Sequence, residues 1–469
     1  MKNCIVAVVL AATGAAAADP IERIVADVSP ARIEANIRAL AAFGTRNSLS
    51  DPDSSVRGVG AARRWILEEL RRCGGERLQV AFDEHRIESG PRIPKATSIV
   101  NVVATLPGTQ AESRARTYVV SGHSDSMPTS PVDPERDAPG VNDDASGTAV
   151  AMELACVMSK YPFDATLVFM AVAGEEQGLL GSEGYARAAR ARGADIAGMI
   201  TNDIVGNTRS PDGVVDRGRL RLFAEGVPAV KTLPDEVVHA LQTGGENDLP
   251  TRQLARRIRE AAERYVPGFK VEVVWRRDRY LRGGDHFPFL DQGYPAVRFT
   301  EPVEDWHHQH QDVRVEDGVQ YGDLPQFVDF GYVAQVARVN AAALASLALA
   351  PAAPRGVEVE NVRLENDTTL RWTPNGEPDI AGYRIVWRAT TEADWQFSRD
   401  VGNVSRATLV GISKDNFSFG LQAYDRDGNV SVATYPRPYR PLMPAPPVAP
   451  AAAPSVAPAG AASPAPVPR

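Results

Sequence analysis

TYVVSGH at residues 117–123 and TLVFMAVAG at residues 166–174 are two apolar runs of strand length, and each ends at a turn. Between them, residues 146–160 carry apolar side chains at helical spacing. A strand, a helix and a second strand in this order predict a right-handed parallel crossover. The stretch therefore favours an open α/β sheet, whose ligand crevice lies beyond the carboxyl ends of its strands.

Residues that bind metals stand where these predicted strands end. They are His123 and Asp125 after the first run, Asp143 and Asp144 before the helix, Glu175 and Glu176 after the second run, Asp203 after a strand at 196–202, and His308 further on. A histidine is a good zinc ligand, and Asp125, two residues beyond His123, can accept the other ring proton. The pattern predicts a metal site at the carboxyl edge of the sheet.

Two divalent ions a few ångströms apart need a shared ligand and further ligands on each ion. A carboxylate of the Asp143 and Asp144 pair can bridge the ions, although Asp144 could also simply cap the helix. Glu175 and Glu176 are adjacent, so one can bind an ion while the other acts as general base toward water. So many candidate ligands at strand ends, in a chain with only 7 histidines, favour a metal-dependent hydrolase.

The 469 residues are 43% hydrophobic and 23% charged, which indicates a globular chain with more than one domain. A formal charge of −8 argues against a nucleic-acid-binding surface. Residues 1–18 have the pattern of a cleaved secretory signal, and we expect an exported protein, periplasmic or extracellular, without a membrane span. Of the remaining cysteines, Cys73 and Cys156, we expect two unpaired thiols.

The chain divides into two folded parts. Residues 19–350 form the predicted α/β domain, with a single pattern of helical spacing at 21–43 and an insertion of loops and a helix at 207–275 over the site. Alternating strands then predict a β-sandwich at 355–440, which resembles a fibronectin type III module. Residues 441–469 are rich in alanine and proline, and we expect a disordered tail.

The motifs, taken in order, resemble the co-catalytic di-zinc exopeptidases typified by secreted bacterial leucyl aminopeptidases. The resemblance is carried by His123-Ser-Asp125, by GVNDDASG at 140–147, by Gly174-Glu175-Glu176, by Asn202-Asp203 and by His308. It covers roughly residues 21–350 and implies a mostly parallel central sheet with helices on both faces, plus the C-terminal all-β sandwich.

The resemblance also implies a role for each residue. Two zinc ions would be bound, one by His123, Asp143 and Asp203, and the other by Asp143, Glu176 and His308, with Glu175 as the base and a cis bond between Asp143 and Asp144. The family's histidine stands four residues before an aspartate, which selects His308 over its neighbours His307 and His310. His286 matches a family segment near the substrate.

The implied activity is removal of N-terminal residues from peptides or proteins. The alternatives are a carboxypeptidase or a single-zinc glutaminyl cyclase of the same superfamily, and an inactive binding ectodomain. Arginines 276, 277, 279 and 282 would favour acidic substrates unless they form a solvated loop. A further expectation is contact of the C-terminal module with a surface or matrix.

Overall fold

The computed structural model describes residues 19–439, so the predicted signal segment at 1–18 and the predicted tail at 441–469 lie outside the described residues. The helices are α1 (Pro20–Ala26), α2 (Pro30–Ala41), α3 (Gly58–Gly74), α4 (Ala145–Met158), α5 (Leu180–Ala191), α6 (Asp235–Leu241), α7 (Pro250–Tyr265), α8 (His286–Asp291) and α9 (Phe330–Ala348). Within residues 19–439, no helix is both long enough and apolar enough to cross a membrane.

A large sheet forms the centre of the first domain. Its strands are β1 (Gln79–Ile87), β2 (Thr97–Leu106), β3 (Arg116–His123), β4 (Thr166–Val172), β5 (Asp195–Asn202), β6 (Arg219–Ala224), β7 (Lys270–Val274) and β8 (Ala296–Thr300). They lie in the order β1-β2-β4-β3-β5-β8-β6-β7. The four central strands β4, β3, β5 and β8 are parallel to one another, and β4 and β8 also pair antiparallel with β2 and β6 at the outer side of this group. The predicted parallel crossover and the predicted mostly parallel sheet are confirmed.

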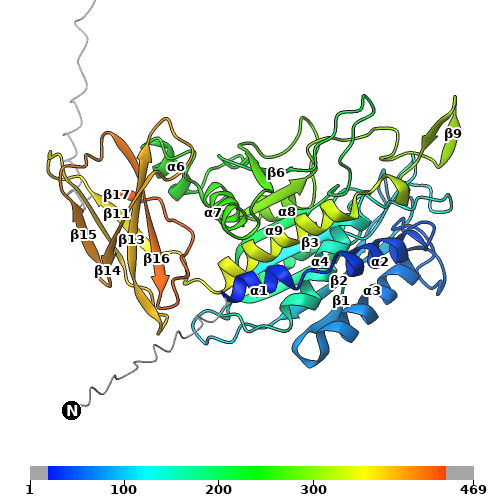
Figure 1. The fold of residues 1–469 in the computed structure, drawn as a ribbon, viewed down its shortest axis with the longest axis horizontal. Helices are drawn as coiled ribbons and strands as arrows, with labels where there is room; N and C mark the ends of the chain where they lie inside the picture. Colours follow the sequence, from blue (N-terminus) through cyan, green and yellow to red (C-terminus); the bar gives the residue numbers. More distant parts are fainter. Residues whose placement is uncertain (1–18, 440–469) are drawn as a thin grey trace, which may run out of the picture.

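Helices cover both faces of this sheet, as predicted (Figure 1). Side chains of β3 alternate between the two cores. Val120 packs in the core that contains α1, α2, α4 and α9. Val119 packs in the second core, which contains residues of α5 and α8.

Two local features differ from the predictions. The helical spacing at 21–43 is divided into α1 and α2, because Pro30 begins the second helix and the Ser29 side chain caps it. The segment at 207–275 contains the expected helix α7, but it also supplies β6 and β7, which extend the central sheet at one edge. This segment is therefore part of the sheet as well as of the loops around it.

The two cysteines form a disulfide, which corrects the prediction of unpaired thiols. Cys73 lies near the end of α3 and Cys156 lies in α4. The two helices pack against each other and bring the two Cα atoms within 5.2 Å, although 83 positions separate the residues in sequence. The sequence shows each cysteine near a helix end but does not show that these two helices are neighbours.

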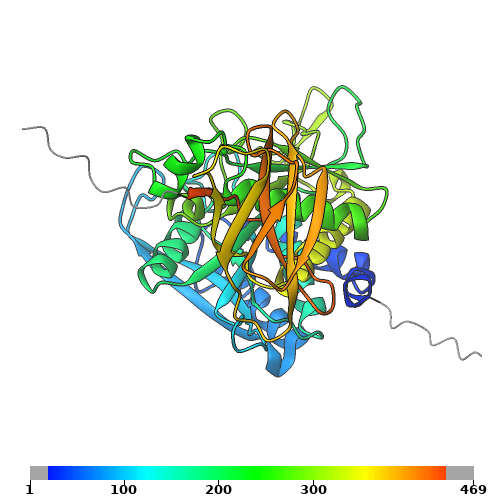
Figure 2. The same ribbon diagram turned by 90° about the vertical axis from the view of Figure 1, so that its left-hand side faces the viewer.

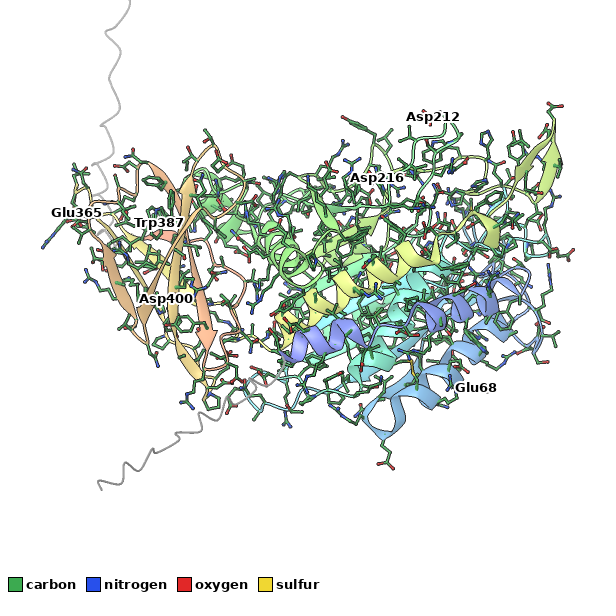
Figure 3. All side chains as sticks on the ribbon, viewed as in Figure 1. Glu68, Asp212, Asp216, Glu365, Trp387 and Asp400 are labelled. Atoms are coloured by element: carbon green, nitrogen blue, oxygen red, sulfur yellow. A yellow bond between two sulfur atoms is a disulfide. The ribbon has the colours of Figure 1, made fainter. Side chains whose placement is uncertain are left out.

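The C-terminal domain is a sandwich of two sheets (Figures 1 and 2). One sheet contains β15 (Arg406–Leu409), β12 (Thr368–Thr373), β11 (Arg355–Glu360) and β17 (Arg437–Tyr439), and the other contains β14 (Phe397–Gly402), β13 (Ile380–Ala389) and β16 (Phe417–Asp425). Trp372, Tyr383 and Trp387 lie in the core between them. Figure 3 shows Trp387 within this domain and Glu365 at its outer edge.

Buried charged groups join the sandwich to the first domain. Asp248, before α7, pairs with Arg388 of β13 at 2.6 Å and with Arg256 of α7 at 3.3 Å, and all three are nearly inaccessible to solvent. The Arg256 guanidinium lies between the rings of Trp275 and Trp395, 5.2 Å and 5.6 Å from their centroids. This ionic and aromatic contact indicates a fixed interface between the domains.

Candidate metal centre

Four of the five predicted ligands meet at the carboxyl edge of the parallel strands. His123 is the last residue of β3, Glu176 follows β4, Asp203 follows β5, and Asp143 precedes α4. Because these strands are parallel neighbours, their ends lie at the same edge of the sheet. His123, Asp143 and Glu176 each offer one ligand atom, and the three atoms lie within 4.8 Å of one another.

Asp143 lies between two histidines. Its Oδ1 atom is 3.0 Å from His123 Nε2, and its Oδ2 atom is 2.9 Å from His310 Nε2. His310 Nε2 is also 3.2 Å from Glu176 Oε2, and His123 Nε2 is 3.8 Å from Asp203 Oδ1. Ligands of a tetrahedral zinc at about 2 Å lie roughly 3.3 Å apart. The nitrogen and oxygen atoms present therefore fit two metal positions that share Asp143.

Charge and hydrogen bonding prepare Asp143 and Glu176 for a cation. Burial alone would raise the pKa of Asp143, but His310 and His123 hold it well below its usual value. The Oε1 atom of Glu176 is buried and has no hydrogen-bond partner among the described residues. A buried acceptor without a partner is costly, and a bound cation would satisfy it.

The histidine that faces Asp143 and Glu176 is His310, whereas the sequence pattern selects His308. The His308 ring stacks on Phe327, 3.6 Å between centroids, and its Nδ1 atom is 3.7 Å from Asp305. His310 has a left-handed backbone with φ 53°, which turns its ring toward Asp143. Counting residues from an aspartate does not detect this backbone turn.

Asp125 supports both neighbouring motifs. Its carboxylate oxygens accept the backbone N–H groups of Glu175 and Glu176 at 3.3 and 3.2 Å. The His123 Nδ1 atom lies 3.2 Å from the backbone oxygen of Asp125 and 3.6 Å from its carboxylate. Asp125 therefore orients the histidine mainly through its carbonyl, while its side chain holds the two glutamates.

The Asp143–Asp144 peptide is cis, as the resemblance implied. Asp144 caps α4 by accepting the Gly147 N–H at 2.9 Å, and its second oxygen accepts the His123 N–H at 2.9 Å. Asp323 accepts the N–H of Asp143 at 2.7 Å. Asp144 thus caps α4 and anchors the backbone of His123, and Asp143 is the residue that faces the histidines.

Glu175 is the partly exposed carboxyl beside these ligands. Burial raises the pKa of Glu175 well above its usual value, and the carboxylates of Asp203 and Glu176 raise it further against the opposing charge of His123. A carboxyl group that can accept and return a proton at this position suits general acid–base chemistry.

The contacts of His286 lie outside the group of His123, Asp143 and Glu176. It is fully buried, and its Nε2 atom is 2.9 Å from the Arg277 carbonyl and 3.5 Å from Asp278. Its neighbour Asp285 is the residue that belongs to the charged cluster around Glu175. Burial raises the pKa of Asp285 to about 7, and Asp203 and Asp125 add to the rise.

Two buried arginines, not predicted from the sequence, support the loops. Arg46 donates to the carbonyl oxygens of Ser124 at 2.7 Å and Gly140 at 2.8 Å, and so joins the loops that carry His123 and Asp143. Arg298, in the middle of β8, pairs with Asp203. A charged residue inside an apolar strand such as AVRFT was the available signal, since a buried charge requires a partner.

A ligand-binding carboxylate and histidine cluster at the carboxyl edge of an open α/β sheet defines a metal-dependent hydrolase. Residues 101–322 match peptidase family M28. The chain is 45% identical over 423 residues to a Leptosphaeria maculans protein named "Probable zinc metalloprotease", covering 90% of this chain and 97% of that one. A Pyricularia oryzae protein of the same name is 45% identical over 420 residues, covering 88% and 83%. The chain belongs to peptidase family M28.

Among solved structures, LapA from Legionella pneumophila matches with a TM-score of 0.50 and 16% identity, over 70% of this chain and 76% of that chain. At this identity the likeness concerns the fold alone. It agrees with the central sheet and the helices on both of its faces.

Proposed function

We propose that this M28 peptidase is an exported aminopeptidase that binds two zinc ions and removes N-terminal residues from peptides or proteins. The observation that supports it is the position of Asp143, whose two oxygens face His123 and His310 separately. His123, Asp143 and Asp203 would hold one ion, and Asp143, Glu176 and His310 the other. Bound zinc would supply Lewis-acid polarisation of the peptide carbonyl and lower the pKa of water.

The protein's own groups perform the proton transfers in this proposal. Glu175 stands beside the ligands, is partly exposed, and has a pKa raised above its usual value. It would take a proton from water and deliver it to the amine that leaves. Asp125 holds the Glu175 backbone N–H and fixes the position of this base.

Export is supported by the disulfide. Cys73 and Cys156 are joined, and such bonds persist mainly in oxidising compartments. The predicted signal at 1–18 is consistent with export. The intact mass of the exported protein tests the cleavage site, because cleavage after Ala18 leaves a chain that starts at Asp19. The likeness of the C-terminal sandwich to a fibronectin type III module, and its contact with a surface or matrix, remain predictions.

The activity test uses purified protein and four substrate sets: aminoacyl p-nitroanilides, the same compounds with a blocked amine, peptides for C-terminal release, and N-terminal glutaminyl peptides. Chelator-sensitive turnover of the first set and none of the second set is expected, because an aminopeptidase requires the free amine. Release of the C-terminal residue from the third set would instead indicate a carboxypeptidase, and release of ammonia rather than glutamine from the fourth set would indicate a cyclase.

Glu175→Gln tests the base, with Glu183→Gln on the exposed surface of α5 as the matched control. Glu175→Gln should keep its zinc and lose roughly 100- to 10,000-fold in kcat, the usual contribution of general-base catalysis. The control should match the wild type. Full activity of Glu175→Gln would remove this residue from the mechanism.

A further inference from the structure

One oxygen of Asp203 has two partners. Its Oδ1 atom faces His123 Nε2 at 3.8 Å, on the side where an ion would bind, and the same atom is 2.9 Å from Arg298 Nη2. The other oxygen faces Gly284, where an added Cβ would lie 3.0 Å from it. The ligand atom available to an ion is therefore also the atom that binds the guanidinium.

The Arg298 side chain is held in this position. It is 1% exposed, and its Nη1 atom lies 3.1 Å from Asp278 Oδ2 and donates to the Gly283 carbonyl. Gly284 permits this approach, because a Cβ there would be 3.1 Å from Arg298 Nη1. These contacts hold the guanidinium beside Asp203 and away from solvent.

A charged donor weakens a carboxylate as a metal ligand. The oxygen that accepts from a guanidinium has less electron density for a cation, and the guanidinium charge repels a second positive charge nearby. Loss of a group that hydrogen-bonds a metal ligand typically weakens metal binding by roughly 10- to 100-fold, and a guanidinium that competes for the ligand oxygen should act on the same scale with the opposite sign. Arg298 should therefore lower the zinc affinity of the position to which Asp203 contributes.

Within residues 19–439, the position of Asp143, Glu176 and His310 has no arginine or lysine paired with its carboxylates. Glu176 Oε2 and Asp143 Oδ2 face His310, and the additional donor to Asp143 Oδ2 is the neutral amide of Gln309 at 3.0 Å. A neutral donor withdraws less density than a guanidinium. The two positions therefore differ in the charge that surrounds them, although they share Asp143.

We propose that Arg298 competes with the zinc ion for Asp203 Oδ1. As a result, the position formed by His123, Asp143 and Asp203 has a lower zinc affinity than the position formed by Asp143, Glu176 and His310. The inference rests on the proposed two-ion site. It gives Arg298 the role of a positioning residue that sets the balance between the two ions.

The test measures zinc binding to the metal-free full-length protein in zinc buffers, with bound metal counted by mass spectrometry. The wild type should show two classes of site whose affinities differ by roughly 10- to 100-fold. Arg298→Met keeps the length of the side chain and removes its charge, so the weaker class should tighten toward the stronger one. Asp278 would keep its contact with Arg279 at 3.1 Å in this variant.

Asp278→Asn should have the opposite effect. Arg298 would lose one of its two carboxylate partners and interact more strongly with Asp203, so the weaker class should weaken further. Arg279→Met is the matched control, because among the described residues Arg279 forms ion pairs with Asp278 and Glu304 and none with a proposed ligand. Where Arg298→Met does not fold, Asp278→Asn carries the test.

The outcomes separate this inference from the proposed function. Two sites of equal zinc affinity in the wild type would overturn the role of Arg298, and so would a weaker class whose affinity is unchanged by both substitutions. The aminopeptidase proposal would stand in either case. One zinc site in the wild type and two in Arg298→Met would support the competing role of Arg298 most strongly. Absence of both zinc binding and peptide hydrolysis would refute the proposed function itself.

Discussion

Replacing His310 and His308 separately with alanine distinguishes the two candidate ligands. The His310 imidazole is within 2.9 Å of Asp143 and 3.2 Å of Glu176, whereas the His308 ring stacks on Phe327. His310→Ala should therefore release the ion that Glu176 would hold. His308→Ala should leave both ions in place.

The expected magnitude follows from the number of ligands. Structural zinc sites with four ligands gain roughly 10–16 kcal/mol, or about 3 kcal/mol per ligand. Loss of His310 should thus weaken one ion by about 100-fold. Loss of the His308 stack on Phe327 should cost only about 1 kcal/mol of folding stability.

The assay is zinc content after dialysis against a series of zinc buffers, together with thermal unfolding of the metal-free proteins. Alanine at position 310 must adopt a left-handed backbone, which costs about 1 kcal/mol, and the metal-free measurement reports this cost separately. Release of zinc by His308→Ala, with normal zinc in His310→Ala, would refute the assignment of His310.

Three further predictions concern stability. Cys73→Ser with Cys156→Ser should lower the free energy of unfolding in guanidinium by about 4 kcal/mol, because the bond closes a loop of 83 positions, and reductant should abolish the difference from wild type. Burial and the neighbouring carboxylates raise the pKa of Asp164 to about 6. The folded state therefore binds this proton more tightly than the unfolded state, and the free energy of unfolding falls as pH rises from about 4 to 6. Asp164→Asn should flatten this slope and raise the free energy of unfolding at pH 7 by about 1 kcal/mol, a value that allows for solvent screening. Arg388→Met should cost about 2 kcal/mol in thermal unfolding, since Asp248 keeps one of its two buried partners, and an unchanged midpoint would contradict a structural role for the interface.

The central fold was predictable because long apolar runs determine it. The strands at 117–123 and 166–172 and the helix between them are read directly from their periodicity, and the ends of those strands locate His123 and Glu176. The strand β6 was also visible as the alternation RLRLFA, but its arginines gave it the composition of a loop. Where local pattern and burial agree, the sequence suffices.

The rest depends on contacts between distant parts of the chain. The pairing of Cys73 with Cys156 requires the packing of α3 on α4, and the choice of His310 requires one backbone angle. Arg298 and Asp285 acquire their surroundings only when β8 and α8 reach the ligands. Periodicity contains no information of this kind.

The interface between the domains also fixes the distance between the sandwich and the metal centre. At the start of β3, Arg116 contacts Glu377 of the C-terminal domain at 3.5 Å, and at its end His123 enters the metal centre. The 8 residues of this strand span roughly 25 Å. Because the buried contact at Asp248 fixes the sandwich, this spacing does not vary as it would with a flexible tether. A molecule attached through the sandwich would hold the metal centre at a constant distance, set by the length of β3, from the contact between the domains.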